Sequence, residues 1–142
     1  LYTSIIPNLL VDGIVDAILK SLALKVYVCN VMTQEGETEG YTASDHITAL
    51  FQHSAPGLFH LCLVNSSPIP QDAAERYARE GAELLRYDKE RCAALGVELV
   101  SRPIAMMQDG FVRHHPDRLA QELILLHAER NVRIAGGRYR IE

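Results

Sequence analysis

Residues 25–41, KVYVCNVMTQEGETEGY, decide the fold. The opening KVYVC is a short apolar run of β-branched and aromatic residues, which predicts a buried strand. The run stops at a polar, glycine-bearing loop that carries three carboxylates and no basic residue. In open α/β sheets, ligands bind beyond the carboxyl ends of the strands. We therefore expect Asn30, Thr33 and Gln34 to lie where a ligand would meet the sheet.

Helices are predicted on both sides of this strand. Before it, Asp12 is expected to cap a helix over residues 14–21. The inner face of that helix would carry Ile14, Ala17, Ile18 and Leu22. After the acidic loop, TASD at residues 42–45 has the spacing of a capping box, a hydroxyl followed three residues later by a carboxylate. Apolar residues at helical spacing then predict a helix that ends near Ser54.

The rest of the chain continues the alternation of strands and helices. Further strands are expected at residues 58–64, 84–87 and 97–100, with an extended apolar segment at 103–107. Further helices are expected at residues 71–83, at 89–95 behind an Asp88 cap, and at 116–130. The last helix would face inward with Leu119, Leu123, Leu126 and His127. This alternation predicts an α/β fold, a parallel sheet with helices on both faces. Residues 1–130 would form one domain, and 131–142 a tail that is either a loose hairpin or disordered.

Composition limits the classes of function. At 142 residues with 48% hydrophobic residues, the chain can bury a core as one domain. A net charge of -4 argues against a general nucleic-acid or membrane-surface binder, because both partners are anionic. No apolar run approaches the ~20 residues that cross a bilayer, and no signal peptide is visible. Few cysteines in an odd number (Cys29, Cys62 and Cys92) indicate buried free thiols in a cytoplasmic protein. Because the chain does not begin with Met, we expect a longer protein around it.

Catalytic and metal motifs are weak. His46, His53 and His60 are evenly spaced, but seven-residue steps match no established ligand pattern. No G-x-S-x-G, Walker A or G-x-G-x-x-G motif is present. The glutamates at 35, 37 and 39 would point the same way in an extended loop. They could hold Mg²⁺ with a nucleotide's phosphates, or simply be a solvated acidic loop.

Binding residues are better indicated than catalytic ones. Arg113 is expected in a loop shortly before a helix, where a guanidinium can fork onto a diphosphate. Tyr77 lies on a helical stripe of small residues, so its ring would either stack on a flat base or pack into the core. Thr3 and Ser4 would cap a first helix or bind an anion at its N-terminus. Thr33, Thr38 and Thr42 lie on a loop expected to be exposed, which makes them candidate phosphorylation sites.

Two long motifs carry a resemblance to a known family. LYTSIIPNLL at residues 1–10 and KVYVCNVMTQEGETEGYTASDHI at residues 25–47 are similar to the gluconeogenesis factor (YvcK-like) family. These proteins are distant relatives of 2-phospho-L-lactate transferase (CofD-like). The resemblance continues more weakly through RYAREGAELLRYDKERCAALGV and DGFVRHHPDRLAQEL. It implies a Rossmann-like core of which this chain is the C-terminal part.

The resemblance implies a function and a site. Relatives of this kind bind UDP-sugars such as UDP-N-acetylglucosamine and act in carbon metabolism and cell-envelope and cell-shape maintenance, without an established reaction. Tyr77 and Arg113 match the family's binding tyrosine and arginine, and Asn30, Thr33, Thr3 and Ser4 are carried over with them. We thus expect a non-catalytic regulator that needs no cofactor beyond a nucleotide-bound Mg²⁺. The protein could also form a homo-oligomer. The alternative is a transferase that acts on a deazaflavin acceptor, with Asp45 or the acidic loop supplying the chemistry.

Overall fold

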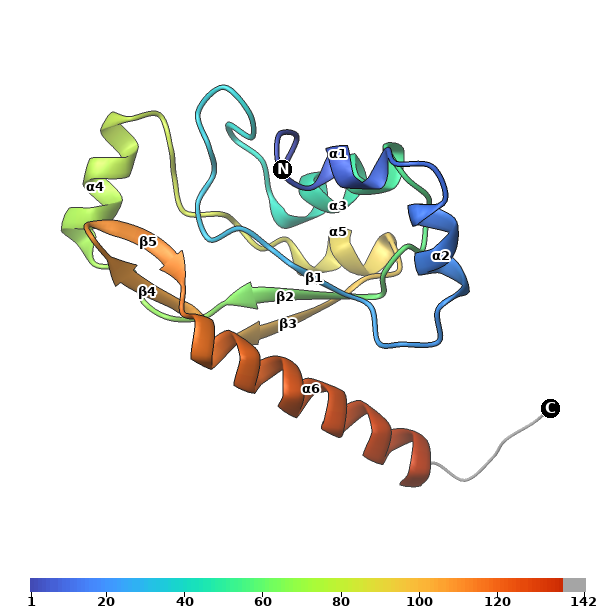
Figure 1. Cartoon of the computed structure of the whole chain (residues 1–142). Coiled ribbons are helices and arrows are strands. Elements are labelled where there is room, and N and C mark those ends of the chain that lie inside the picture. The colour runs from blue at the N-terminus through green and yellow to red at the C-terminus, as the bar shows by residue number, and fades with distance from the viewer. Residues whose placement is uncertain (137–142) are drawn as a thin grey trace.

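A computed structural model of the chain describes residues 1–136, and for 131–136 it describes the backbone only. Helices and strands alternate along most of the chain (Figure 1). In order they are α1 (Ile6–Leu9), α2 (Ile14–Lys20), β1 (Val26–Val28), α3 (Ala43–Gln52), β2 (Leu61–Asn65), α4 (Gln71–Arg79), α5 (Lys89–Ala94), β3 (Glu98–Arg102), β4 (Ala105–Gln108), β5 (Phe111–His114) and α6 (Pro116–Gly136). No helix in this part of the chain combines the length and the apolar character that crossing a membrane requires.

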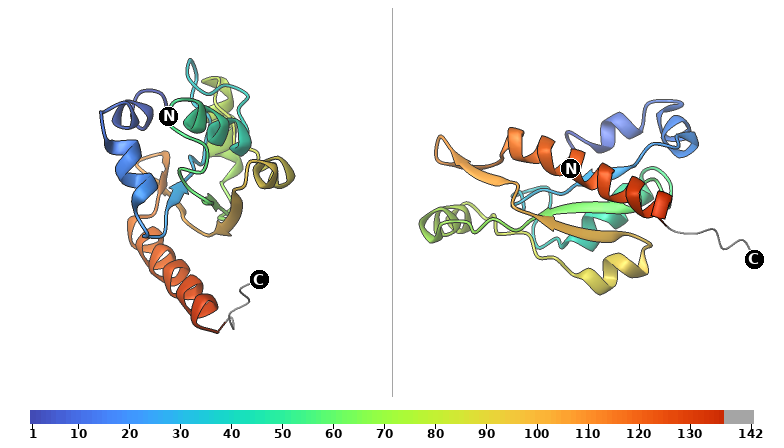
Figure 2. Two further views of the ribbon diagram at one scale, coloured as in Figure 1. Left: turned by 90° about the vertical axis from the view of Figure 1, so that its right-hand side faces the viewer. Right: turned by 90° about the horizontal axis from the view of Figure 1, so that it is seen from below.

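A three-stranded parallel sheet in the order β1-β2-β3 forms the centre of the molecule. Every residue of β2 is buried, as expected for the middle strand of a sheet covered on both faces. The helices α1, α3 and α5 lie on one side of the sheet and α6 lies on the other (Figures 1 and 2). The predicted α/β, Rossmann-like fold with helices on both faces is therefore confirmed.

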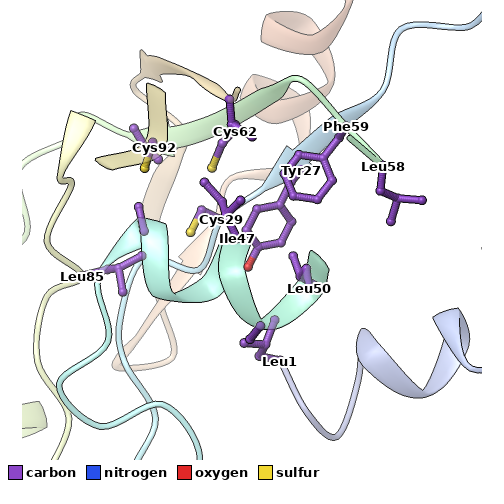
Figure 3. Packing of buried hydrophobic residues seen from close by; sticks show 14 of the residues in the cluster. Leu1, Tyr27, Cys29, Ile47, Leu50, Leu58, Phe59, Cys62, Leu85 and Cys92 are labelled. Carbon is purple, nitrogen blue, oxygen red and sulfur yellow. The ribbon is translucent and has the colours of Figure 1, made fainter. Parts of the chain in front are cut away.

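The two faces of the sheet have separate apolar cores because side chains alternate along each strand. On the face toward α3, Tyr27 and Cys62 pack with Ile47, Leu50 and Phe59 (Figure 3). On the other face, Leu61, Leu63 and Val100 pack with Leu126 of α6. The cysteines at 29, 62 and 92 are free and buried in the first core, so the prediction of buried thiols is confirmed.

The first turn of α3 is fixed from two directions. The predicted capping box is present, with the Thr42 N–H donating to the Asp45 carboxylate at 2.9 Å. Asp88 was expected to cap its own helix, but its carboxylate makes no such cap in α5. It instead accepts hydrogen bonds from the Ser44 backbone N–H at 3.0 Å and from the Ser44 and Thr42 hydroxyls. Burial alone would raise the pKa of Asp88, and these donors hold it below its usual value.

Several local expectations are wrong for identifiable reasons. Gly13, in the left-handed region at φ 82°, occupies the N-cap of α2, so Asp12 does not cap it. Leu22 is fully exposed, and no residue of α2 is buried. The helix predicted at residues 71–83 stops at Arg79, because Gly81 adopts a left-handed φ of 73°. Residues 84–87 form isolated bridges and no strand.

The final helix also differs from expectation. Leu119, Leu123 and Leu126 face the sheet as predicted, whereas His127 is exposed. The helix continues past Arg130 to Gly136, so residues 131–136 are helical and form no hairpin. Residues 137–142, the rest of the predicted tail, lie outside the described part of the chain.

Between β3 and α6 the chain forms an antiparallel hairpin, β4–β5. Its turn, Asp109-Gly110, has φ 50° and 80°, the left-handed values that a two-residue hairpin turn requires. The sequence predicted the turn but placed Arg113 in a loop, whereas Arg113 belongs to β5 opposite Met106. This hairpin extends beyond the carboxyl end of the parallel sheet, next to α4 (Figure 1).

Candidate functional site

A cleft of about 430 Å³ lies between the carboxyl end of β1, helix α4 and strand β5. This volume is within the range of small-molecule sites in proteins. The lining residues are Asn30, Val31, Met32, Thr33, Gln34, Tyr77, Phe111, Val112, Arg113 and His114. The structure thus brings together four residues expected to bind a ligand, namely Asn30, Thr33, Tyr77 and Arg113.

Tyr77 lies between α4 and the hairpin. Its ring is half-buried and packs against the cluster formed by Val31, Met32, Ala105 and Val112. The backbone N–H of Val112 donates a hydrogen bond to the Tyr77 hydroxyl at 3.0 Å. The structure confirms the packing alternative for Tyr77 and also places the ring at the cleft, while stacking of the ring on a flat base stays a prediction.

Arg113 brings a positive charge to the rim. Its side chain is exposed, and its guanidinium carbon lies 5.3 Å from the centre of the Phe111 ring. Both residues lie on the same face of β5, because side chains two apart in a strand point the same way. Within residues 1–136, no carboxylate forms an ion pair with Arg113. The cation is therefore available to an anionic ligand.

The loop after β1 forms the opposite wall and is held by backbone hydrogen bonds. The Thr33 N–H donates to the Glu83 carbonyl, and the Thr33 hydroxyl accepts from the Glu83 N–H, both at 2.8 Å. The Leu85 N–H donates to the Val31 carbonyl at 3.0 Å. Thr33 therefore shapes the wall while half-buried Asn30 presents an amide beside it. The expectation of exposure is wrong for the three threonines, since Thr33, Thr38 and Thr42 are all buried.

His114 is a cleft residue that the sequence did not assign to the site. Its Nε2 donates a hydrogen bond to the Cys29 carbonyl at 3.1 Å. This contact joins β5 directly to the end of β1, the two walls of the cleft. Reading Asp109-Gly110 as the turn of a hairpin would have placed Phe111, Arg113 and His114 on one strand and could have found it.

Thr3 and Ser4 do not reach this cleft. The Thr3 N–H and hydroxyl donate to the Glu37 carboxylate at 2.8 and 2.9 Å, and neither side chain caps α1. Glu39 accepts from the Gly36 N–H, so of the three glutamates one is engaged within the loop and Glu37 is engaged by Thr3. In the described part of the chain, no three His, Cys, Asp or Glu side chains gather in a way that could hold a metal ion.

The fold and this cleft define an α/β protein with a cleft at the carboxyl end of a parallel sheet. The sequence profile of 2-phospho-L-lactate transferase CofD matches residues 1–105, and the chain belongs to this family.

Individual relatives of known name narrow the comparison within the family. The chain is 45% identical over 124 residues to a gluconeogenesis factor of Halalkalibacterium halodurans, covering 87% of this chain and 38% of that protein. It is 43% identical over 129 residues to the gluconeogenesis factor of Bacillus subtilis, covering 91% and 41%. A crystal structure of a Bacillus halodurans protein superposes with a TM-score of 0.82 at 45% identity, over 87% of this chain and 40% of that one. The chain therefore spans about two fifths of the length of these relatives.

Proposed function

We propose that this chain contributes a binding site for a nucleotide sugar of the UDP-N-acetylglucosamine type. The protein that contains it would be a cytoplasmic regulator of carbon metabolism and of cell-envelope and cell-shape maintenance. The observation that carries the proposal is the convergence of Asn30, Tyr77 and Arg113 on one cleft beyond the end of β1. The names of the relatives, gluconeogenesis factors, agree with a role in carbon metabolism.

Each side chain has a physical role in the proposed complex. The half-buried ring of Tyr77 offers a flat apolar surface for the uracil base. Arg113, exposed and without a carboxylate partner among the described residues, pairs with the diphosphate through its planar guanidinium. Any Mg²⁺ would arrive with the phosphates of the nucleotide, so the protein needs no cofactor of its own. Thr3 and Ser4 lie outside the cleft and have no role in this complex.

Thermal unfolding of the full-length protein tests the proposal. A ligand that binds only the folded state stabilises it by about 2.7 kcal/mol at one hundred times its Kd, so Tm should rise with UDP-N-acetylglucosamine. Arg113→Ala should abolish the shift. Arg79→Ala, which removes an exposed arginine of α4 outside the cleft, is the matched control and should keep it. An unchanged Tm in the wild-type protein at millimolar ligand would refute nucleotide-sugar binding.

The rival function is phospholactyl transfer, which the name of the matching family favours. Of its proposed acidic groups, Asp45 is already engaged, since it accepts the Thr42 N–H and pairs with Arg91 at 3.3 Å. Incubation with a guanylylated phospholactate donor, a deazaflavin acceptor and Mg²⁺ separates the two functions. Formation of the phospholactyl-deazaflavin product would refute the proposal of a non-catalytic regulator and show that the protein is a transferase.

A further inference from the structure

The outer edge of β3 has no partner strand within the described residues. In the parallel ladder, the Glu98 N–H donates to the His60 carbonyl, and the Arg102 carbonyl accepts from the Ser66 N–H. Because alternate residues of a strand bond to the same neighbour, the backbone groups of Leu99 and Ser101 point away from β2. An edge of this kind can pair with a further strand unless something covers it.

Two hollows flank this edge and leave it accessible. On the α6 side, a cleft of about 250 Å³ runs along all of β3 and is lined also by Leu126, Glu129 and Arg130. On the α5 side, a hollow of about 290 Å³ lies beside Val97 and Leu99. The strand itself contains no proline or lysine, the residues that most often block such an edge.

The sequence of β3, Glu98-Leu99-Val100-Ser101-Arg102, is complementary to itself. Suppose that β3 of a second copy pairs with this strand in the antiparallel direction, with a two-fold axis at Val100. Glu98 of each copy then lies opposite Arg102 of the other copy. Leu99 then lies opposite Ser101 of the second copy, and these are the residues whose backbone groups point outward. A two-fold axis requires such self-complementarity, since the same patch meets itself.

We propose that β3 is a dimerisation edge, at which two copies of this chain join their parallel sheets into one continuous sheet. The Leu99–Ser101 pairs are the hydrogen-bonded pairs of the new ladder, each exchanging two backbone hydrogen bonds. The charged residues form the closer, non-hydrogen-bonded pairs, in which opposite charges stabilise the contact.

The charged side chains are already positioned on the correct face. Arg102 contacts Glu122 and Glu129 at 3.1 Å, and Arg130 contacts Glu98 at 2.6 Å, so all of them lie on the α6 side of the sheet. Pairing about the axis extends these contacts into one alternating network across the interface. Each copy contributes two arginines and three glutamates to this network, and the reciprocal Glu98–Arg102 pairs require a partner that presents both charges at these positions, as a second copy does.

Ser101 supplies a variant that separates pairing from folding. Its N–H points outward, so Ser101→Pro removes an intermolecular donor and leaves every bond to β2 in place. We expect the full-length wild-type protein to sediment as a concentration-dependent dimer, and Ser101→Pro to raise the dimer dissociation constant by roughly tenfold or more. Ser101→Ala keeps the N–H and should remain as dimeric as the wild type. A monomeric wild type, or an undiminished dimer in Ser101→Pro, would overturn the proposal.

A cross-link tests the register without relying on the fold of the proline variant. Across the two-fold axis, Val100 faces its own counterpart at a Cα separation of about 4.5 Å, which a disulfide can span. Val100→Cys should therefore form a covalent dimer under mild oxidation. Ser101→Cys, whose counterpart is a leucine, should not, and the native cysteines are buried. Cross-linking of both variants, or of neither, contradicts this pairing.

Discussion

The parallel sheet and the β4–β5 hairpin are stabilised in different ways. Residues of β2 are buried on both faces between α3 and α6, so many apolar contacts fix their position. The hairpin is attached by a smaller apolar cluster, in which Ala105 and Val112 pack with Val31 and Met32, and by polar contacts such as those from Tyr77 to Val112 and from His114 to Cys29. The cleft therefore has one wall built on the main core and another, the hairpin, that is joined to it by a smaller set of apolar and polar contacts.

The largest expected effect is in the core. Leu63 is fully buried under α6, and Leu63→Ala should lower the free energy of unfolding by about 3 kcal/mol, through lost burial and the cavity left behind. Urea unfolding measures this change. Leu22→Ala, at a fully exposed position, should change it by less than about 0.5 kcal/mol. Similar losses at the two positions would contradict the assignment of the core.

A pH dependence comes next in size and also belongs to the core. His46 is fully buried, with its Nδ1 3.0 Å from the Tyr27 hydroxyl, and burial lowers its pKa to about 4. In the unfolded chain a histidine has a pKa of about 6.5, so below that pH the unfolded state binds more protons than the folded state. Stability should therefore fall as the pH drops from about 6.5 to about 4, by up to about 3 kcal/mol in total.

Urea unfolding across this range measures the slope. His46→Gln should flatten it, and His60→Gln, at an exposed position, should leave it unchanged. A wild-type protein equally stable at both ends of the range would contradict the lowered pKa of His46 in the folded state.

The smallest effect is in the hairpin. Tyr77→Phe keeps the ring and leaves the Val112 N–H without its acceptor, at a cost of about 1 kcal/mol. In hydrogen exchange, the Val112 amide should exchange about fivefold faster. The Cys29 amide, which is bonded to Leu63 in the sheet, should not change. Equal acceleration at both amides would mean that hairpin and sheet open together.

The sequence predicted the structure best where the residues that form an element and the residues that stabilise it are neighbours in the sequence. The capping box at Thr42 and Asp45 is read from neighbouring residues and is confirmed. The apolar strand predicted at 58–64 is also present, although it begins and ends later, at Leu61–Asn65. Errors arise where a distant partner decides. Asp88 stands where a cap is expected, but its carboxylate binds Ser44 and Thr42, far away in sequence.

The same reasoning applies to the candidate site. Asn30 and Tyr77 could be proposed from a strand end and a family motif, and the structure places both in one cleft. His114 could not, because its contact with the Cys29 carbonyl depends on how the hairpin folds back onto β1. Thr3 lies outside the cleft because its hydroxyl binds Glu37, a distant residue in the sequence that the resemblance does not point to.

The Asp109-Gly110 turn has a consequence for how such proteins can diversify. Because the hairpin turns back on itself within two residues and packs outside the sheet, its length and side chains can vary while the packing of β1, β2 and β3 stays the same. Evolution can therefore reshape one side of the cavity through this appendage alone. A scaffold organised in this way can acquire a new ligand preference without first having to find a new stable fold.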